Sequence, residues 1–203
     1  MLVGGCVLLF LGVQEVRLAS GAKAKARDIT CAELGEKGPG DNAHVRMGEF
    51  LLCEFSFVYE SKEGQSDRYE RVWVPAVPLE GEYHRQLRQH VEEKGAAAAA
   101  DLPMPRDLRV VVKSGRVHND AELEALAMGD TLEGMVVNRI SGLGGEERKI
   151  LQDSYPGVDF SKVYILEHGR TPAGFGKTAG LLGGGAALVL VPVGLFVLRR
   201  RGA

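Results

Sequence analysis

The chain has few cysteines and histidines, and it lacks the short motifs that mark many enzyme sites. Its 203 residues include only three cysteines and one tryptophan, and no Gly-x-Ser-x-Gly, His-Glu-x-x-His or Cys-x-x-Cys motif occurs. The five histidines show no metal-site spacing, since His84 and His90 would lie nearly opposite each other on a helix. We therefore expect no metal site, no cofactor and no motif-based catalytic centre, with each histidine at the surface.

Positive charge is scarce in the middle of the chain. Between residues 28 and 177, 18 lysines and arginines stand against 26 aspartates and glutamates, a net charge of −8. No basic stripe interleaved with aromatic residues occurs, and a domain this acidic repels phosphate backbones. These features argue against nucleic acid as a partner.

Charge of either sign is absent from residues 178–198, a run of 21 residues. As a helix this run would span about 31 Å, the thickness of the hydrocarbon core of a bilayer. Arg199, Arg200 and Arg201 follow directly, which is typical of a stop-transfer sequence, and the positive-inside rule places them in the cytoplasm. The sequence thus predicts a transmembrane helix over 177–198 and a cytoplasmic basic tail over 199–203.

Glycines recur at every fourth position near the start of this apolar run. Gly176, Gly180 and Gly184 would lie along one helix face, where a second helix could approach closely and form a homo-oligomer. The alternative is that glycine is simply common in membrane helices. The sequence leaves both readings open.

The apolar segment at the N-terminus, within 1–19, is too short to span a bilayer. Leu2–Val13 would form only about 18 Å of helix. It is either a signal peptide, although a positive n-region and a cleavage site are missing, or a membrane anchor that begins upstream of the given start, which we favour. Arg17 and Lys23 would hold this end inside the cell, but the arginine triplet adjoins the longer segment, so we expect the middle of the chain to be extracytoplasmic.

The middle of the chain is predicted to be a linker over 20–43 and a folded domain over 44–176. Alternating apolar residues over 45–59 predict a half-buried strand that forms a hairpin with 68–77, in which Pro75 lies at an edge or strand end. Residues 96–100 are expected to form a loop. The remaining elements are predicted as strands 108–113, 131–140 and 162–167 and helices 82–94, 119–128 and 146–155. Together they indicate an α+β fold, a small mixed sheet with a leading β-hairpin and about three helices.

Two cysteines fall in the predicted linker and domain. Cys31 and Cys53 could form a disulfide if the domain is exported. The alternative is that Cys53 is buried on the apolar face of its strand. Trp73 is expected to be a core or edge-strand aromatic residue.

Two resemblances concern the layout of the chain. Val72-Trp73-Val74-Pro75, between two hydrophobic ends, resembles the surfeit-locus family of cytochrome oxidase assembly factors, which would imply a membrane-anchored assembly role. That family's aromatic run before its second span is absent here. Residues 132–172, with VVN, SYPG and ILEHGRTP, resemble bacterial membrane-anchored proteins without an assigned activity, which would imply a location but no chemistry.

The functional prediction is a membrane-anchored binding or assembly module of the cell envelope, with another envelope protein as a partner. One alternative is an envelope hydrolase or redox protein with a site built from dispersed residues. A deep pocket that gathers carboxylates, histidines or cysteines would favour this alternative. The other alternative is a structural membrane protein that acts through its glycine-faced span.

Overall fold

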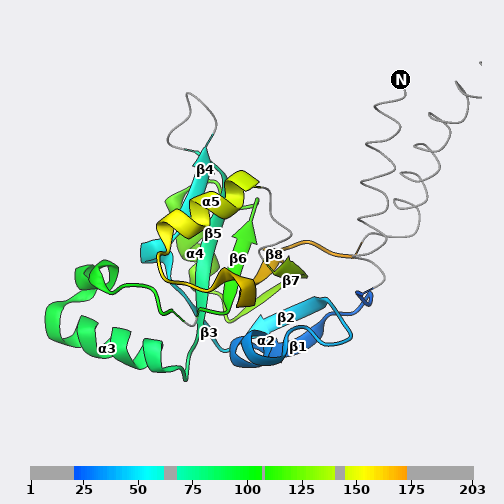
Figure 1. Cartoon of the computed structure of the whole chain (residues 1–203), viewed down its shortest axis with the longest axis horizontal. Coiled ribbons are helices and arrows are strands. Elements are labelled where there is room, and N and C mark those ends of the chain that lie inside the picture. The colour runs from blue at the N-terminus through cyan, green and yellow to red at the C-terminus, as the bar shows by residue number, and fades with distance from the viewer. Residues whose placement is uncertain (1–20, 62–67, 107, 140–144, 173–203) are drawn as a thin grey trace, which may run out of the picture. The chain divides into compact units, whose positions relative to one another are not determined.

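The computed structural model describes residues 21–61, 68–106, 108–139 and 145–172 (Figure 1). Residues Ala24 to Thr171 belong to one compact unit. No helix in this described part of the chain is both long and apolar enough to span a bilayer. The following predicted features lie outside the described residues: the segments 1–19 and 177–198, the tail with Arg199, Arg200 and Arg201, and the glycines Gly176, Gly180 and Gly184.

The described unit is built on one mixed sheet of eight strands. The strands are β1 (Arg27–Thr30), β2 (His44–Gly48), β3 (Phe50–Leu52), β4 (Val58–Ser61), β5 (Tyr69–Pro78), β6 (Val110–Ser114), β7 (Thr131–Arg139) and β8 (Tyr164–His168). Their order is β1-β2-β7-β8-β6-β5-β3, and β4 also pairs with β5. The pairs β1–β2 and β6–β8 are parallel, whereas the others are antiparallel. The prediction of a mixed sheet combined with helices is confirmed.

Four α-helices and three short 3-10 helices accompany the sheet in the described residues. They are α2 (Cys31–Lys37), α3 (Glu82–Lys94), α4 (Asp120–Ala127), α5 (Gly145–Ser154), η1 (Glu54–Ser56), η2 (Ala96–Asp101) and η4 (Phe160–Lys162). The bounds of α3 are those predicted. Asn119 caps α4, because its side chain accepts a hydrogen bond from the Glu122 amide at 2.9 Å. The alanine run expected to be a loop forms η2 instead.

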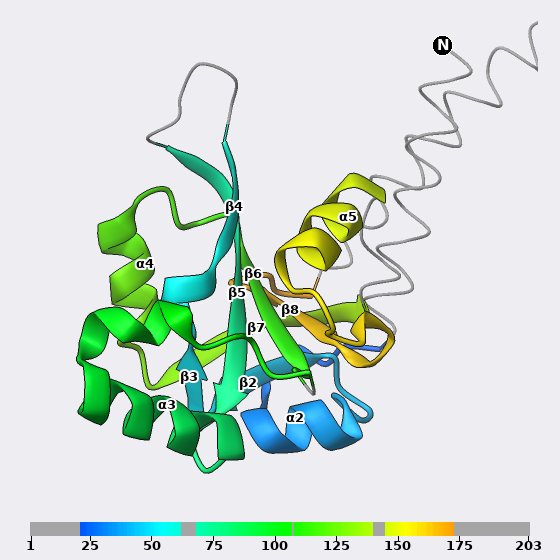
Figure 2. The ribbon, with the colours of Figure 1, turned by 60° about the vertical axis from the view of Figure 1, so that its left-hand side comes forward.

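Helices cover both faces of the sheet, as Figure 2 shows for α4 and α5 on opposite sides of β5. Along β5, Val72, Val74 and Ala76 pack with side chains of α2 and α4, whereas Trp73 and Val77 pack with those of α3 and α5. This alternation follows from the two-residue period of a strand. Trp73 is therefore a core residue, and the centre of β5 is buried on both sides.

The segment predicted as one strand over 45–59 is broken into three strands. Glu49 has a positive φ of 54° and separates β2, which pairs with β7, from β3, which pairs with β5. β2 is second from one end of the strand order and β3 is at the other end. Because a single residue joins them, the sheet must curve until its two sides are close. The predicted hairpin exists as β4–β5, but it does not lead the fold, because β1, α2, β2 and β3 precede it.

Strand β1 and helix α2 occupy part of the predicted linker 20–43. Thr30 begins α2 with a capping box: its hydroxyl accepts from the Glu33 amide at 3.1 Å, and the Glu33 carboxylate accepts from the Thr30 amide at 3.4 Å. Gly38, with a φ of 73°, ends the helix. The glycine-rich stretch 35–43 concealed this short helix, because its turn signals begin inside it.

Pro75 lies within β5 and not at a strand end. Its carbonyl accepts a hydrogen bond from the Cys53 amide at 2.9 Å, so this side of Pro75 faces the break between β3 and β4. A proline has no N–H to donate to a ladder. The interruption of the neighbouring strand thus accommodates it.

Candidate ligand-binding pocket

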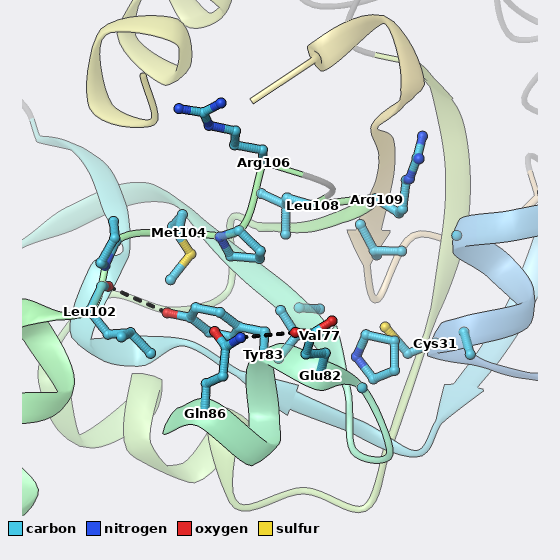
Figure 3. A pocket seen from close by; sticks show the side chains of 18 of the residues that line it. Cys31, Val77, Glu82, Tyr83, Gln86, Leu102, Met104, Arg106, Leu108 and Arg109 are labelled. Atoms are coloured by element: carbon cyan, nitrogen blue, oxygen red, sulfur yellow. Dashed lines mark hydrogen bonds between the residues drawn. The ribbon is translucent and has the colours of Figure 1, made fainter. Parts of the chain in front are cut away.

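A pocket of about 870 Å³ opens between α2 and α3 (Figure 3). It is lined by one face of α2, the first turn of α3, the end of β5, the segment 102–106, the residues that lead into β6, and Pro156. Figures 1 and 2 both place α2 and α3 at the same end of the sheet. The volume is within the range of roughly 300–1,000 Å³ typical of small-molecule sites.

Helix α2 forms one wall of the pocket. Its capping box fixes the residue at which the helix begins and so which side chains face the pocket. Cys31, Ala32, Gly35 and Glu36 line the pocket, and their spacing places them on one helix face. Gly35 allows a close approach to Arg109, the residue before β6: a Cβ at position 35 would lie only 2.7 Å from the Cβ of Arg109. This glycine therefore determines how near Arg109 lies to α2.

The opposite wall is formed by α3 and the segment 102–106. The Tyr83 side chain is buried, and its hydroxyl donates a hydrogen bond to the Leu102 carbonyl at 3.4 Å. Pro103 and Pro105 restrict the backbone of this segment, and the Pro105 carbonyl accepts from the Leu108 amide at 3.1 Å. This wall is thus largely formed before any ligand arrives.

Apolar and polar groups contribute about equally to the surface of the pocket. The aliphatic side chains come from the sheet and from the segment that leads into β6, and they are Ala76, Val77, Val110, Leu102, Met104 and Leu108. The four prolines are Pro78, Pro103, Pro105 and Pro156. These side chains can bury an apolar part of a ligand, which removes apolar surface from water, and the polar part of the lining can hydrogen-bond the rest.

Charged groups of opposite sign lie on different sides of the pocket. In Figure 3, Arg106 and Arg109 lie on one side, and Glu82 lies on the other with Tyr83 beside it. Glu82 accepts a hydrogen bond from Gln86 at 3.1 Å and occupies the first turn of α3, where a carboxylate is favourable. Within the described residues, neither arginine makes an ion pair, and Arg109 is half-buried.

The cysteine in the pocket wall is not an activated nucleophile. Burial raises the pKa of the Cys31 thiol to about 12, so this thiol is protonated at neutral pH. Cys53 has a pKa raised to about 12 by its burial and by the neighbouring Cys31. Both are free thiols in the structure, and they belong to core clusters on different faces of the sheet. Cys31 acts here as a small apolar wall residue.

A second arrangement of reactive side chains lies at the other end of β6. The hydroxyl of Ser114, the last residue of β6, and the Nδ1 of His168, the last residue of β8, are 3.2 Å apart. Ser114 is completely buried, and its hydroxyl also accepts from the Arg116 amide at 3.2 Å. The pair resembles a nucleophile and its base in composition, but Ser114 is closed to a substrate and bound into a turn.

The expectation that every histidine lies at the surface is wrong for His44. This side chain is buried, and its Nε2 lies 3.3 Å from a Glu133 carboxylate oxygen. It begins β2, and the partner strand β7 brings Glu133 beside it. Among the residues that the structure describes, no group of three or more His, Cys, Asp or Glu side chains could hold a metal ion.

No family model, curated protein or solved structure matches this chain. The resemblances described from the sequence therefore remain predictions, and the functional argument rests on the geometry of the pocket.

The sequence prediction included only Cys31 among the pocket residues, and for a different reason. The one local signal is the segment Leu102–Arg106, which reads Leu-Pro-Met-Pro-Arg. Alternate prolines exclude both a regular helix and a central strand, so this segment has to form an irregular wall. Its approach to α2 and α3 depends on tertiary packing that the local pattern does not contain.

Proposed function

We propose that the protein is a membrane-anchored binding or assembly module of the cell envelope, and that its binding site is the pocket between α2 and α3. The apolar run 178–198 is the tether, Arg199, Arg200 and Arg201 lie in the cytoplasm, and the acidic domain is extracytoplasmic. Gly176, Gly180 and Gly184 give the tether a face for homo-oligomer formation. The partner is a component of the envelope.

The observation that carries this proposal is a pocket whose walls combine apolar and polar groups and whose rim is held by prolines. The prolines and the Tyr83–Leu102 hydrogen bond keep the cavity open. Preformed cavities bind ligands at a lower ordering cost than sites that must assemble. The charged groups in the lining can orient a ligand, whereas the protonated Cys31 thiol supplies no nucleophile.

The alternative is an envelope hydrolase or redox protein. Two observations favour it: the pocket gathers Cys31, Glu36 and Glu82, and Ser114 and His168 lie within hydrogen-bond distance of each other. Against it, the Cys31 thiol has a raised pKa, and Ser114 is buried outside the pocket lining. Labelling of Ser114 by a fluorophosphonate, absent in Ser114→Ala, would favour the hydrolase over the binding module.

The tether is tested by fractionating cells that produce the full chain or a chain truncated before residue 178. We expect the full chain to stay in the membrane pellet after an alkaline carbonate wash and the truncated chain to appear in the supernatant. Equal distribution of the two chains would contradict the anchoring proposal.

The pocket is tested with one obstructing variant and one matched control. Ala32 is an exposed pocket residue on α2, and Ala125 is an exposed residue on α4 outside the pocket lining. We expect Ala32→Trp to abolish recovery of the molecules that copurify with the full chain from detergent extracts, and Ala125→Trp to leave this recovery unchanged. Mass spectrometry measures both. Unchanged recovery with Ala32→Trp would show that the pocket is not the binding site.

A further inference from the structure

Three aromatic side chains gather on one face of the β4–β5 hairpin. They are Phe57, which follows η1, Tyr59 in β4, and Tyr69 at the start of β5. The ring centroid of Phe57 lies 5.6 Å from that of Tyr59 and 5.4 Å from that of Tyr69, and the two tyrosine centroids are 4.7 Å apart. Such distances are typical of favourable aromatic pairs. The rings therefore support one another in the absence of any partner.

The register of the hairpin explains why the three rings share a face. Phe57 and Tyr59 are two residues apart in extended chain, so they point to the same side. A register shift between Glu60 and Ser61 pairs Ser61 with Tyr69, which brings Tyr69 to that side as well. It is the side of β5 on which Figure 2 shows α4.

Tyr59 is the exposed member of this cluster. Of its surface, 47% is accessible, whereas Phe57 and Tyr69 are half-buried. An exposed tyrosine ring that two other rings hold in place is typical of the centre of a protein interface. None of the three residues lines the pocket between α2 and α3, so this is a separate surface.

Three carboxylates adjoin the aromatic cluster. Asp120, the first residue of α4, accepts a hydrogen bond from the Tyr69 hydroxyl. Glu124 lies one turn further along the same face of α4. Glu54 begins η1, three residues before Phe57, a spacing at which the side chains of a 3-10 helix lie above one another. Because η1 contacts α4, the three carboxylates form one acidic border. We call this surface the aromatic face: Phe57, Tyr59 and Tyr69 with Glu54, Asp120 and Glu124.

The carboxylates of the aromatic face favour a cationic partner. Among the residues that the structure describes, none of these three carboxylates makes an ion pair. Burial, and then the charge of Glu124, raise the pKa of Glu54, so these two side chains repel each other. A cation would relieve this repulsion. A neutral or anionic partner would remove the carboxylates from water without pairing them.

We propose that the aromatic face binds a basic segment of a partner protein through arginine side chains. A guanidinium stacks on a tyrosine ring and forms paired hydrogen bonds with a carboxylate, so one arginine can use both parts of the face. The net charge of −8 over residues 28–177 attracts a basic partner from a distance. This inference goes beyond the proposed function, because it assigns a second binding surface.

The test uses the full chain in phosphatidylcholine nanodiscs and three fluorescein-labelled peptides, in which glycine alternates with arginine, lysine or glutamate. Fluorescence anisotropy measures binding, and empty nanodiscs are the blank. We expect the arginine peptide to bind about threefold or more tightly than the lysine peptide, because an ammonium group lacks the planar fork. The glutamate peptide should not bind. Equal binding of the arginine and lysine peptides would overturn the inference, because the rings would then contribute nothing specific to arginine.

Two substitutions of Tyr59 test the contribution of its ring. Tyr59→Ala should weaken binding of the arginine peptide about fivefold, whereas Tyr59→Phe, which keeps the ring, should change it by less than about twofold. The control is Leu79→Ala, which removes a side chain that is 41% exposed beyond the opposite end of β5. We expect this control to bind the peptide as the unaltered chain does. An equal loss in Tyr59→Ala and Leu79→Ala would contradict the assignment.

A pair of charge variants tests the border. Glu54→Gln with Glu124→Gln should weaken binding of the arginine peptide about fivefold or more. Glu92→Gln with Glu93→Gln removes the same net charge from exposed positions on α3 and should leave binding unchanged. An equal loss in both double variants would overturn the inference, because net charge and not the aromatic face would then be responsible.

The other possible occupant of the aromatic face is a second copy of the chain. If Tyr59→Ala converts a dimer of the full chain into a monomer, as light scattering in detergent would show, and leaves peptide binding unchanged, the inference is wrong. Ala32→Trp in the pocket should not affect peptide binding, since Ala32 lies outside the aromatic face. The pocket and the aromatic face are thus tested independently.

Discussion

The two ends of β6 differ in how they present reactive side chains. At its start, Arg109 and Val110 line an open pocket, and the charged groups there are not paired with each other. At its end, Ser114 contacts His168 directly, but Ser114 is completely buried. The comparison shows that proximity of catalytic residue types does not make a site by itself. Space for a ligand and unsatisfied polar groups around that space are what distinguish the pocket end.

The largest expected effect comes from disturbing the packing at the closed end of β6, where Ser114 and His168 lie. A Cβ at Gly134 on β7 would lie 2.3 Å from the Glu167 carbonyl oxygen on β8. Because that neighbour is backbone, Gly134→Ala has to separate the two strands, and we expect it to lower the free energy of unfolding by about 2–3 kcal/mol. Urea unfolding followed by the fluorescence of Trp73, the only tryptophan, measures this domain alone.

The control for this prediction is Gly145→Ala at the start of α5. No atom lies within 4 Å of the Cβ that this change adds. We expect a change in unfolding free energy of less than about 0.5 kcal/mol, as for other surface substitutions. If both alanine variants unfold at the same urea concentration, the end of β6 near His168 is not closely packed.

Ser114→Ala tests whether the Ser114–His168 pair is structural. The change removes the acceptor of the Arg116 amide and the contact with His168, both in a buried place. We expect a loss of about 1–2 kcal/mol in unfolding free energy. Ser161→Ala is the comparison, because the Ser161 hydroxyl donates a hydrogen bond to Asp159 at the surface. We expect this variant to lose much less unfolding free energy. If Ser114→Ala leaves the unfolding free energy unchanged, the Ser114–His168 pair has a role other than stability.

Elements whose position follows from a local pattern of residues could be predicted from the sequence, whereas features that depend on the whole fold could not. Helix α3 was predicted with its observed bounds, because Tyr83, Leu87 and Val91 repeat at helical spacing. Strand β5 was predicted nearly in full. Its burial on both faces was not predicted, because pairing in a hairpin does not show what covers the faces of the strand. Coverage by helices on both sides is a property of the whole fold.

The N-terminal part of the domain was the least predictable. The alternation over 45–59 is real, but at Glu49 the chain passes from β2, second in the strand order, to β3 at the opposite end. One residue with a positive φ leaves no periodic signal. The candidate site was missed for a related reason. Its lining comes from segments as distant as residues 31 and 156, and only the curved sheet brings them together.

At the pocket end, Gly35→Ala should affect ligand binding more than stability. Alanine improves the helix by up to about 1 kcal/mol, whereas the contact with the Arg109 Cβ at 2.7 Å opposes it. We expect the unfolding free energy to change by less than about 1 kcal/mol. Displacing Arg109 changes the wall of the pocket, so we expect a lower recovery of the molecules that copurify with the full chain. Gly145→Ala, which should leave this recovery unchanged, is again the control.

The smallest expected effect concerns the protonation of His168 at the closed end. Burial, and then the positive charge of Arg116, hold the pKa of His168 below its ordinary value. Since the unfolded chain binds the proton more readily, the contribution of His168 to stability is present above the unfolded value of about 6.5. It is lost as the pH falls through the folded-state pKa. His168 is partly exposed, so we expect this loss to be only a few tenths of a kcal/mol.

An NMR titration of the His168 imidazole resonances measures this pKa directly. We expect a midpoint below that of a free imidazole, and a higher midpoint in Arg116→Gln, because the second cause of the shift is then removed. In His168→Gln, the free energy of unfolding measured in urea should decrease less below pH 6.5 than in the unaltered chain. If His168 titrates at its ordinary value, water reaches the imidazole freely. The closed end of β6 would then be open enough to bind a substrate, and the Ser114–His168 pair would have to be considered as a second site beside the pocket.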